Sequence, residues 1–111
     1  MKTLLFVIVI GAAVVSGLAS AQSIYSVITP KTDVTVSNSA TLIAAANPFR
    51  TALNVTNNSG SVAVRWGDSS VTAGKGQRIP ASATITIGNQ GAVYMISEGA
   101  NVVVSVTEEE R

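Results

Sequence analysis

Apolar and polar residues alternate over most of the chain. The alternation is clearest in Thr84–Ile87 and in residues 102–106, where β-branched residues dominate. A period of two with β-branched residues is typical of strands that bury one face. No stretch past Gln22 sustains a helical period, so the pattern predicts an all-β protein. We predict strands near residues 23–28, 33–37, 41–45, 50–56, 62–67, 76–79, 84–88, 92–97 and 101–107.

Turn-forming residues separate these strands at intervals of about 8–12 residues. Pro30 cannot lie in a central strand, because proline lacks the N–H donor. The Asn-Asn-Ser-Gly sequence at 57–60 predicts a hairpin loop, and Gly-Lys-Gly at 74–76 predicts a tight turn rather than a phosphate-binding loop. We therefore predict one small antiparallel β-sandwich over residues 22–111, jelly-roll-like or Ig-like, with about 7–9 short strands.

Residues 1–21 form a different kind of segment. One lysine is followed by an apolar run over residues 4–15, and the segment ends in Ala19-Ser20-Ala21. This order matches a secretory signal peptide with cleavage between Ala21 and Gln22. The alternative is an uncleaved hydrophobic helix that acts as an N-terminal membrane anchor, because residues 4–21 are uncharged and just long enough to span a bilayer. Either interpretation predicts export of residues 22–111.

Missing residue types exclude several kinds of chemistry. The chain has no cysteine and no histidine, which removes disulfides, thiol nucleophiles, His-containing triads and thiolate or imidazole metal ligands. Seven basic and six acidic residues are present, and Lys2 lies in the N-terminal segment, so residues 22–111 carry no net charge. A neutral domain gives no indication of nucleic-acid binding. We expect neither a cofactor nor a metal.

Few residues offer catalytic chemistry. Asp33, Asp68 and Glu98 are the dispersed carboxylates from which a pair for glycoside hydrolysis would be drawn, but each lies beside Gly, Ser or Thr in a predicted loop. We interpret them as turn formers or solvated charges. No serine stands in a recognisable motif with Lys31 or Lys75. These patterns predict a protein that is not an enzyme.

Two further polar motifs have ordinary explanations. The acidic run at residues 108–110 predicts a solvated tail that keeps the last strand soluble. The sequences at 54–56 and 57–59 match the N-glycosylation acceptor pattern, which matters only in a eukaryotic secretory pathway.

Aromatic and arginine side chains are the candidates for an interface. Trp66 ends an alternating strand with Arg65 on the opposite face, and both residue types are frequent at hot spots. Trp66 is suited to stacking on a sugar or anchoring a partner, although a single Trp in a small sandwich more often belongs to the core. Tyr25, Phe49 and Tyr94 complete the set. Their spacing gives no aromatic ladder for carbohydrate or single-stranded nucleic acid.

A neutral sandwich of this size leaves strand edges exposed. Few of the predicted strands carry the lysines or inward charges that discourage edge pairing. We therefore expect a homo-oligomer, or a subunit docked on another protein. Residues 22–33 lie between the N-terminal segment and the first firm turn, so they are a candidate strand for donation to a neighbour.

A series of turn and strand motifs runs from residue 47 to residue 108. An Asn-Pro-Phe-Arg strand start at 47–50 is followed by a strand, an Asn/Ser/Gly turn and a strand ending in Gly67. A Gly-x-Arg-Ile-Pro turn at 76–80 and a Gly-Ala-Val-Tyr-Met-Ile strand at 91–96 come next. This order resembles small β-sandwich proteins of bacteriophage structural modules. The resemblance implies a capsid decoration, head-fibre or tail-appendage subunit that contacts itself and other virion or capsid proteins.

Two functions of different classes remain open. The first is a structural virion protein, exported or membrane-associated during assembly, because virion proteins assembled in the cytoplasm do not need a leader such as residues 1–21. The second is a secreted or periplasmic binding or adhesion module that contacts glycan or protein through Trp66, Arg65 and neighbouring loops. Cleavage of residues 1–21 favours the second function, and retention favours the first.

Overall fold

The computed structural model describes residues 27–111, and this part of the chain contains nine strands in two antiparallel sheets. It has no helix long and apolar enough to cross a membrane. The all-β class is confirmed, whereas the expected N-terminal helix and Tyr25 lie outside the described residues. One sheet holds β1 (Val27–Pro30), β2 (Val34–Val36), β4 (Arg50–Asn57), β7 (Thr84–Ile87) and β9 (Val102–Glu110). The other holds β3 (Thr41–Ala44), β5 (Val64–Gly67), β6 (Gln77–Ile79) and β8 (Val93–Ser97).

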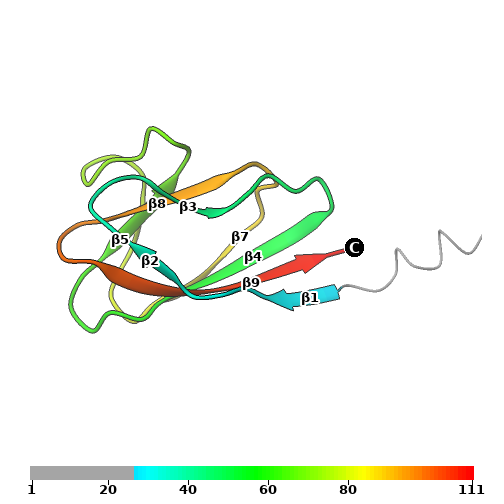
Figure 1. Cartoon of the computed structure of the whole chain (residues 1–111), viewed down its shortest axis with the longest axis horizontal. Helices are drawn as coiled ribbons and strands as arrows, with labels where there is room; N and C mark the ends of the chain where they lie inside the picture. Colours follow the sequence, from blue (N-terminus) through cyan, green and yellow to red (C-terminus); the bar gives the residue numbers. More distant parts are fainter. Residues whose placement is uncertain (1–26) are drawn as a thin grey trace, which may run out of the picture.

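The strand pairings are nested along the chain. β5 pairs with β6, β4 with β7, β3 with β8, and β2 with β9, all antiparallel. The β9–β4 and β8–β5 pairings complete two sheets, in the orders β2-β9-β4-β7 and β3-β8-β5-β6. β1 pairs with the far end of β9, along the same edge as β2. Figure 1 shows the two layers, with β3 and β8 in the upper one and β4 and β9 in the lower one.

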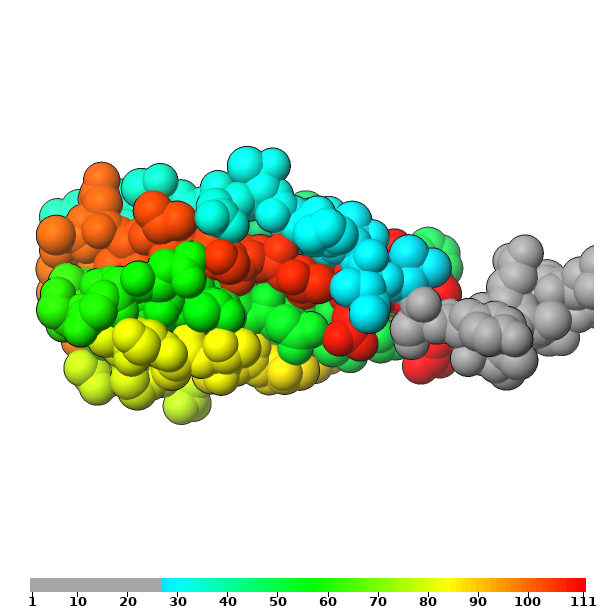
Figure 2. Space-filling model, turned by 90° about the horizontal axis from the view of Figure 1, so that it is seen from below, coloured from blue at the N-terminus to red at the C-terminus, as the bar shows by residue number. Residues whose placement is uncertain are grey.

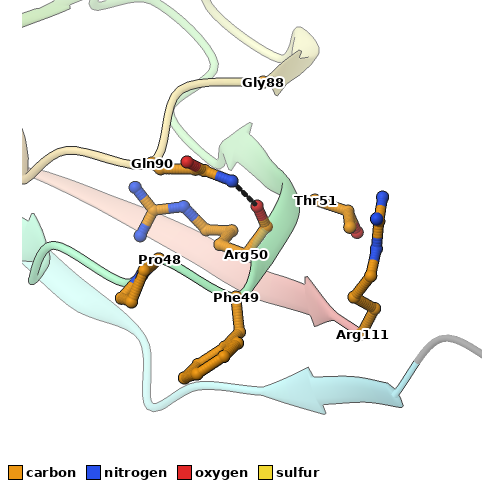
Figure 3. A pocket seen from close by; sticks show the side chains of 7 residues that line it. All are labelled: Pro48, Phe49, Arg50, Thr51, Gly88, Gln90 and Arg111. Atoms are coloured by element: carbon orange, nitrogen blue, oxygen red, sulfur yellow. Dashed lines mark hydrogen bonds between the residues drawn. The ribbon is translucent and has the colours of Figure 1, made fainter. Parts of the chain in front are cut away.

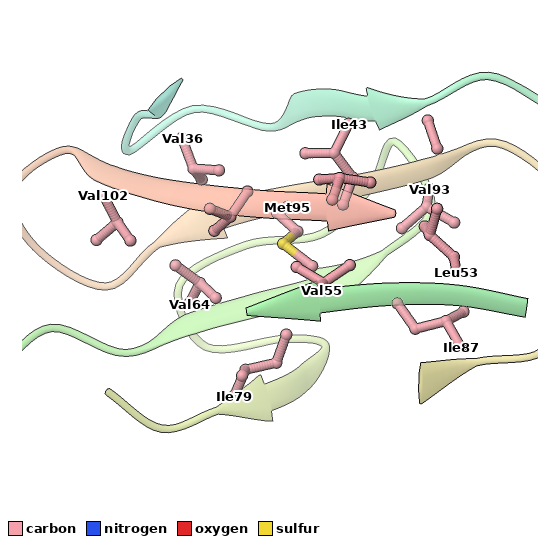
Figure 4. Close-up of a cluster of buried hydrophobic side chains, with 13 residues drawn as sticks. Val36, Ile43, Leu53, Val55, Val64, Ile79, Ile87, Val93, Met95 and Val102 are labelled. Carbon is pink, nitrogen blue, oxygen red and sulfur yellow. The ribbon is translucent and has the colours of Figure 1, made fainter. Parts of the chain in front are cut away.

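The core lies between the two sheets because alternate residues of the strands face inward. Leu53 and Val55 of β4 meet residues from the second sheet, among them Val64 of β5 and Met95 of β8 (Figure 4). All four side chains are fully buried. Both sheets therefore depend on one shared hydrophobic cluster for their stability. Its remaining buried members are Val36, Ile43, Ala44, Ile79, Ile87, Val93, Val102, Val104 and Val106.

The chain crosses between the sheets after almost every strand from β2 onward, and β5–β6 is the exception. The predicted hairpin loop at residues 57–60 is therefore wrong, because β4 and β5 belong to different sheets. The tight turn predicted at residues 74–76 is confirmed: Thr72 and Lys75 exchange backbone hydrogen bonds of 3.0 Å. Gly76 follows with a φ of 135°, and a Cβ there would lie 2.9 Å from the carbonyl oxygen of Trp66. Only glycine fits this approach.

The strand limits differ from the predicted ones at both ends of the described chain. β1 ends at Pro30, at an edge of its sheet, where the missing N–H costs no ladder bond. Residues 27–30, which we expected to be donated to a neighbour, pair instead with β9 of their own chain. β9 continues to Glu110, so the prediction of a solvated acidic tail is wrong.

Asn57, the last residue of β4, joins the two sheets through its side chain. Its amide donates to the carbonyl oxygens of Val62, Ile79 and Pro80 at 2.9, 3.3 and 3.2 Å, and its Oδ1 accepts from the N–H of Ser59 at 2.9 Å. The residue is fully buried. This burial also removes it as a glycosylation acceptor. The side chain of Asn57 therefore supplies hydrogen bonds to backbone groups that have no partner in the sheet ladders.

We expect Asn57→Ala to lower the free energy of unfolding by about 2–3 kcal/mol, because it leaves buried carbonyl groups without donors. Asn58→Ala is the matched control: Asn58 is exposed and its amide donates only to Ser105 Oγ, at 2.8 Å. Denaturant unfolding curves of the two variants measure the difference. Equal losses in both variants would contradict the role of Asn57.

Candidate functional site

A buried ion pair lies at the end of the domain where β4 begins and β9 ends. Arg50 is 1% exposed and Glu108 is 4% exposed, and Arg50 Nη1 lies 3.0 Å from Glu108 Oε2. The same guanidinium donates to the carbonyl oxygens of Ala45, Asn89 and Gly91 at 2.5–3.0 Å. These bonds use all the N–H groups that a guanidinium offers. Arg50 thus ties the β3–β4 and β7–β8 crossovers to β9.

Glu108 is held in its charged form by two cations. Its Oε1 lies 3.2 Å from Nζ of Lys31, which is partly exposed. Burial of this carboxyl works to raise its pKa, but hydrogen bonds from Arg50 and Lys31 outweigh burial. The pKa of Glu108 is therefore below its usual value of 4.5. Two residues further on, Glu110 accepts a hydrogen bond from the side-chain amide of Asn47.

Two open cavities flank the ion pair. The first has a volume of about 300 Å³ and lies beside the start of β4; Figure 3 shows its lining of Pro48, Phe49, Arg50, Thr51, Gly88, Gln90 and Arg111. The second has a volume of about 320 Å³ and is lined by Lys31, Ile43, Ala44, Ala45, Ala46, Asn47, Glu108 and Glu110. Arg50 and Glu108 border these cavities, but their polar atoms are already engaged with each other and with the crossovers. Among the described residues no group of three or more acidic side chains could hold a metal ion.

The same end of the domain carries three exposed apolar residues, which we call the end patch: Val27, Ile28 and Phe49, with Val27 and Ile28 on opposite sides of β1. Each side chain is more than half exposed, and Phe49 is 66% exposed. Val27 pairs with Glu110 on one side of β9, and Arg50 pairs with Glu110 on the other. The carbonyl oxygen of Phe49 accepts from the N–H of Arg111 at 3.1 Å. The end patch therefore brackets the last residues of β9.

The structure does not bring all of the predicted interface residues together, although Arg65 and Tyr94 lie on the neighbouring strands β5 and β8. Phe49 belongs to the end patch, while Arg65, Trp66 and Tyr94 lie in the second sheet. Trp66 packs against the hydrophobic core, and its indole Nε1 is buried with no hydrogen-bond partner among the described residues. Tyr94 is half-buried on the outer side of β8, between the inward-facing Val93 and Met95.

Arg65 takes part in an ion-pair cluster on the outer side of the second sheet. Its Nε lies 2.8 Å from Glu98 Oε2, and Nε of Arg78 lies 3.0 Å from the same oxygen. The hydrogen bonds from Arg78 and Arg65 lower the pKa of the Glu98 carboxyl. Arg65 is consequently engaged within the chain rather than presented to a partner.

The predicted carboxylate candidates are separated in the fold. Asp68 accepts from the side-chain hydroxyl and the backbone N–H of Ser70, and these bonds lower its pKa. Asp68 follows β5 and Glu98 follows β8, and the two strands are antiparallel, so the residues lie at opposite ends of the pair. Asp33 precedes β2 in the other sheet and is exposed. Asp68 is confirmed as a turn former, whereas Glu98 is a member of the ion-pair cluster.

Comparison of the chain with protein-family models, with curated proteins and with solved structures finds no match.

We expect Glu108→Gln to lower the free energy of unfolding at neutral pH by about 3–5 kcal/mol, because the guanidinium of Arg50 then stays buried without a counter-charge. Glu109→Gln is the control, since Glu109 faces the other side of β9 and accepts from Asn54 Nδ2. Denaturant unfolding of both variants measures the difference. A loss in Glu109→Gln as large as in Glu108→Gln would contradict this role.

The same variant tests the pH dependence of stability. A lowered pKa in the folded state gives stability that is present above the unfolded pKa and is lost as the pH falls through the folded pKa. Wild-type protein should therefore lose stability below about pH 4.5, and Glu108→Gln should lose less over the same interval. Equal acid slopes in the two proteins would show that Glu108 does not contribute.

Proposed function

We propose that this protein is a non-enzymatic structural protein of a bacteriophage virion, acting as a capsid-associated, decoration or appendage subunit. The proposal rests on the nested pairing of the eight strands from β2 to β9. Eight strands that pair from the β5–β6 turn outward and wrap into two sheets have the arrangement of a jelly roll. Jelly rolls recur in viral capsid and lectin domains. An Ig-like fold groups its strands differently, as A-B-E-D and C-F-G.

The state of the acidic side chains supports a structural role. Asp68, Glu98 and Glu108 all have lowered pKa values and hydrogen-bond donors beside them. A general acid needs a pKa near the working pH, which is the opposite arrangement. These charges serve to fix turns, crossovers and the outer side of the second sheet.

The end patch supports attachment through one end of the domain. In the sequence, only residues 22–26 separate the predicted signal or anchor segment from Val27. Val27 and Ile28 are therefore close in sequence to that segment. Exposed apolar side chains at one end of the domain suit contact with a capsid protein or with a membrane during assembly.

We expect the chain to be found, with residues 1–21 retained, in large particles that contain coat protein and, during assembly, lipid. Intact mass spectrometry of the particle fraction after density-gradient sedimentation measures this. A chain that begins at Gln22 and stays in the soluble fraction would contradict the proposal. It would favour the secreted or periplasmic binding module instead.

We expect Phe49→Ser to reduce the share of the chain that co-sediments with particles by about tenfold, which corresponds to losing most of one buried aromatic contact. The matched control is Leu42→Ser, since Leu42 is an exposed apolar residue of the second sheet. Quantitative mass spectrometry of gradient fractions compares the two variants. Equal reductions would rule out a specific role for the end patch.

A further inference from the structure

Most free edges of the two sheets carry a feature that hinders pairing with another strand. β1 ends in Pro30, and β2 has only three residues. β3 has a register shift between Leu42 and Ala44. β6 carries Arg78 and is followed by Pro80. Short strands, prolines, bulges and charges are the usual means of protecting a sheet edge.

β7 is also short, with four residues, but it carries no proline, no register shift and no charged residue. All of its residues are β-branched, and its register with β4 is uninterrupted. No charged residue occurs between Arg78 and Glu98 in the sequence. β7 is the last strand of its sheet next to β4, and Figure 2 shows it in yellow near the lower margin of the molecule, with yellow-green atoms of preceding residues beyond it on the left. β7 is thus an open edge that a further strand can join.

The hydrogen-bond pattern between β4 and β7 shows which backbone groups of β7 point outward at this edge. The N–H of Asn57 donates to the carbonyl oxygen of Ala83 at 2.9 Å, so Ala83 is bonded to β4. Residues of an antiparallel strand alternate between bonding one neighbour and the other. Ile85 and Ile87 therefore also bond β4, and the N–H and C=O groups of Thr84 and Thr86 point away from the sheet.

We infer that β7 pairs antiparallel with β7 of a second copy of this chain, around a two-fold axis. The Thr-Ile-Thr-Ile sequence suits such a pairing, because threonines meet threonines on the outer side, while on the inner side Ile85 meets Ile85 and Ile87 meets Ala83 of the second copy. With Ile85 opposite itself, Thr84 lies opposite Thr86 of the second copy. Each such pair exchanges two backbone hydrogen bonds.

Charge and size also favour a second copy as the occupant. Residues 22–111 have no net charge and β7 has none, so two copies approach without repulsion. One short strand buries less than the roughly 1,200–2,000 Å² of a stable complex, so the dimer should form reversibly with rising concentration. The inference deepens the proposed function, on which it rests, by naming the surface through which subunits join.

Thr86→Pro tests the pairing, because it removes an N–H that faces the edge and leaves the ladder to β4 intact. Thr35→Pro is the matched control at the opposite edge. The carbonyl of Val103 accepts from the N–H of Asn58, the residue after β4, so Thr35, which pairs with Val103, also turns its N–H away from the sheet. Sedimentation velocity of the full chain in nonionic detergent, over a concentration series, measures the dimerisation constant.

We expect Thr86→Pro to weaken dimerisation at least tenfold and Thr35→Pro to leave it unchanged. Unfolding curves check that both variants fold. If Thr86→Pro does not, the double substitution Thr84→Lys and Thr86→Lys replaces it, since it opposes like charges across the axis and should weaken dimerisation most at low salt. A wild-type chain that stays monomeric, or equal effects of both prolines, would overturn the inference. The particle experiment on the wild-type chain judges the proposed function separately.

A cross-linking experiment tests the register. The chain has no cysteine, so a Thr84→Cys chain mixed with a Thr86→Cys chain can form a disulfide only between the introduced thiols. Opposite residues of a hydrogen-bonded pair lie about 5.5 Å apart at Cα, within the range of a disulfide. Mixed cross-linked dimers should exceed either homodimer. A predominance of homodimers would overturn the proposed register.

Discussion

The hydrogen-bonded ion pair between Arg50 and Glu108 is the interaction on which the arrangement of the crossovers depends. A buried guanidinium is tolerated only when its charge and all its donors are matched. Glu108 supplies the counter-charge, and carbonyl groups of the two crossovers at this end supply the other acceptors. The dependence is mutual, because those carbonyls lie outside the sheet ladders and would otherwise lack donors. One side chain therefore fixes the last strand and both crossovers relative to β4.

β4 has such a residue at each end. It begins with Arg50 and ends with Asn57, and both side chains are fully buried and donate to carbonyl groups of segments that cross between the sheets. The nested pairing of strands creates the need for them, since nearly every connection leaves one sheet for the other. A sandwich built from hairpins satisfies most of its turn carbonyls locally, whereas this chain satisfies them from the central strand. The hydrophobic core holds the sheets together, and these two polar side chains fix how the ends are connected.

Much of the fold could be predicted from alternation, and the failures have physical reasons. The predicted positions of the strands along the chain were close to the observed ones, because alternation of β-branched residues is a local signal. Arg50 was missed because the register shift between Arg50 and Ala52 turns it inward, although strict alternation from Leu53 would place it outside. Glu108 continues the alternation by which Val102, Val104 and Val106 face inward, so its burial could have been predicted. Its acidic neighbours indicated a solvated tail instead. Pairing between distant strands, which decides the topology, leaves no trace in local sequence.

Several charged side chains of this domain pair with each other, and this affects how the domain can contact other molecules. Arg50, Glu108, Arg65 and Glu98 are engaged within the chain, and the neutral balance of residues 22–111 leaves no field to steer a charged partner. Apolar surface and the backbone groups at a free sheet edge are then the features that could make such contacts. The end patch offers the first and the β7 edge offers the second. A two-fold pairing through β7 closes at two copies, so such a pair would present two end patches for attachment.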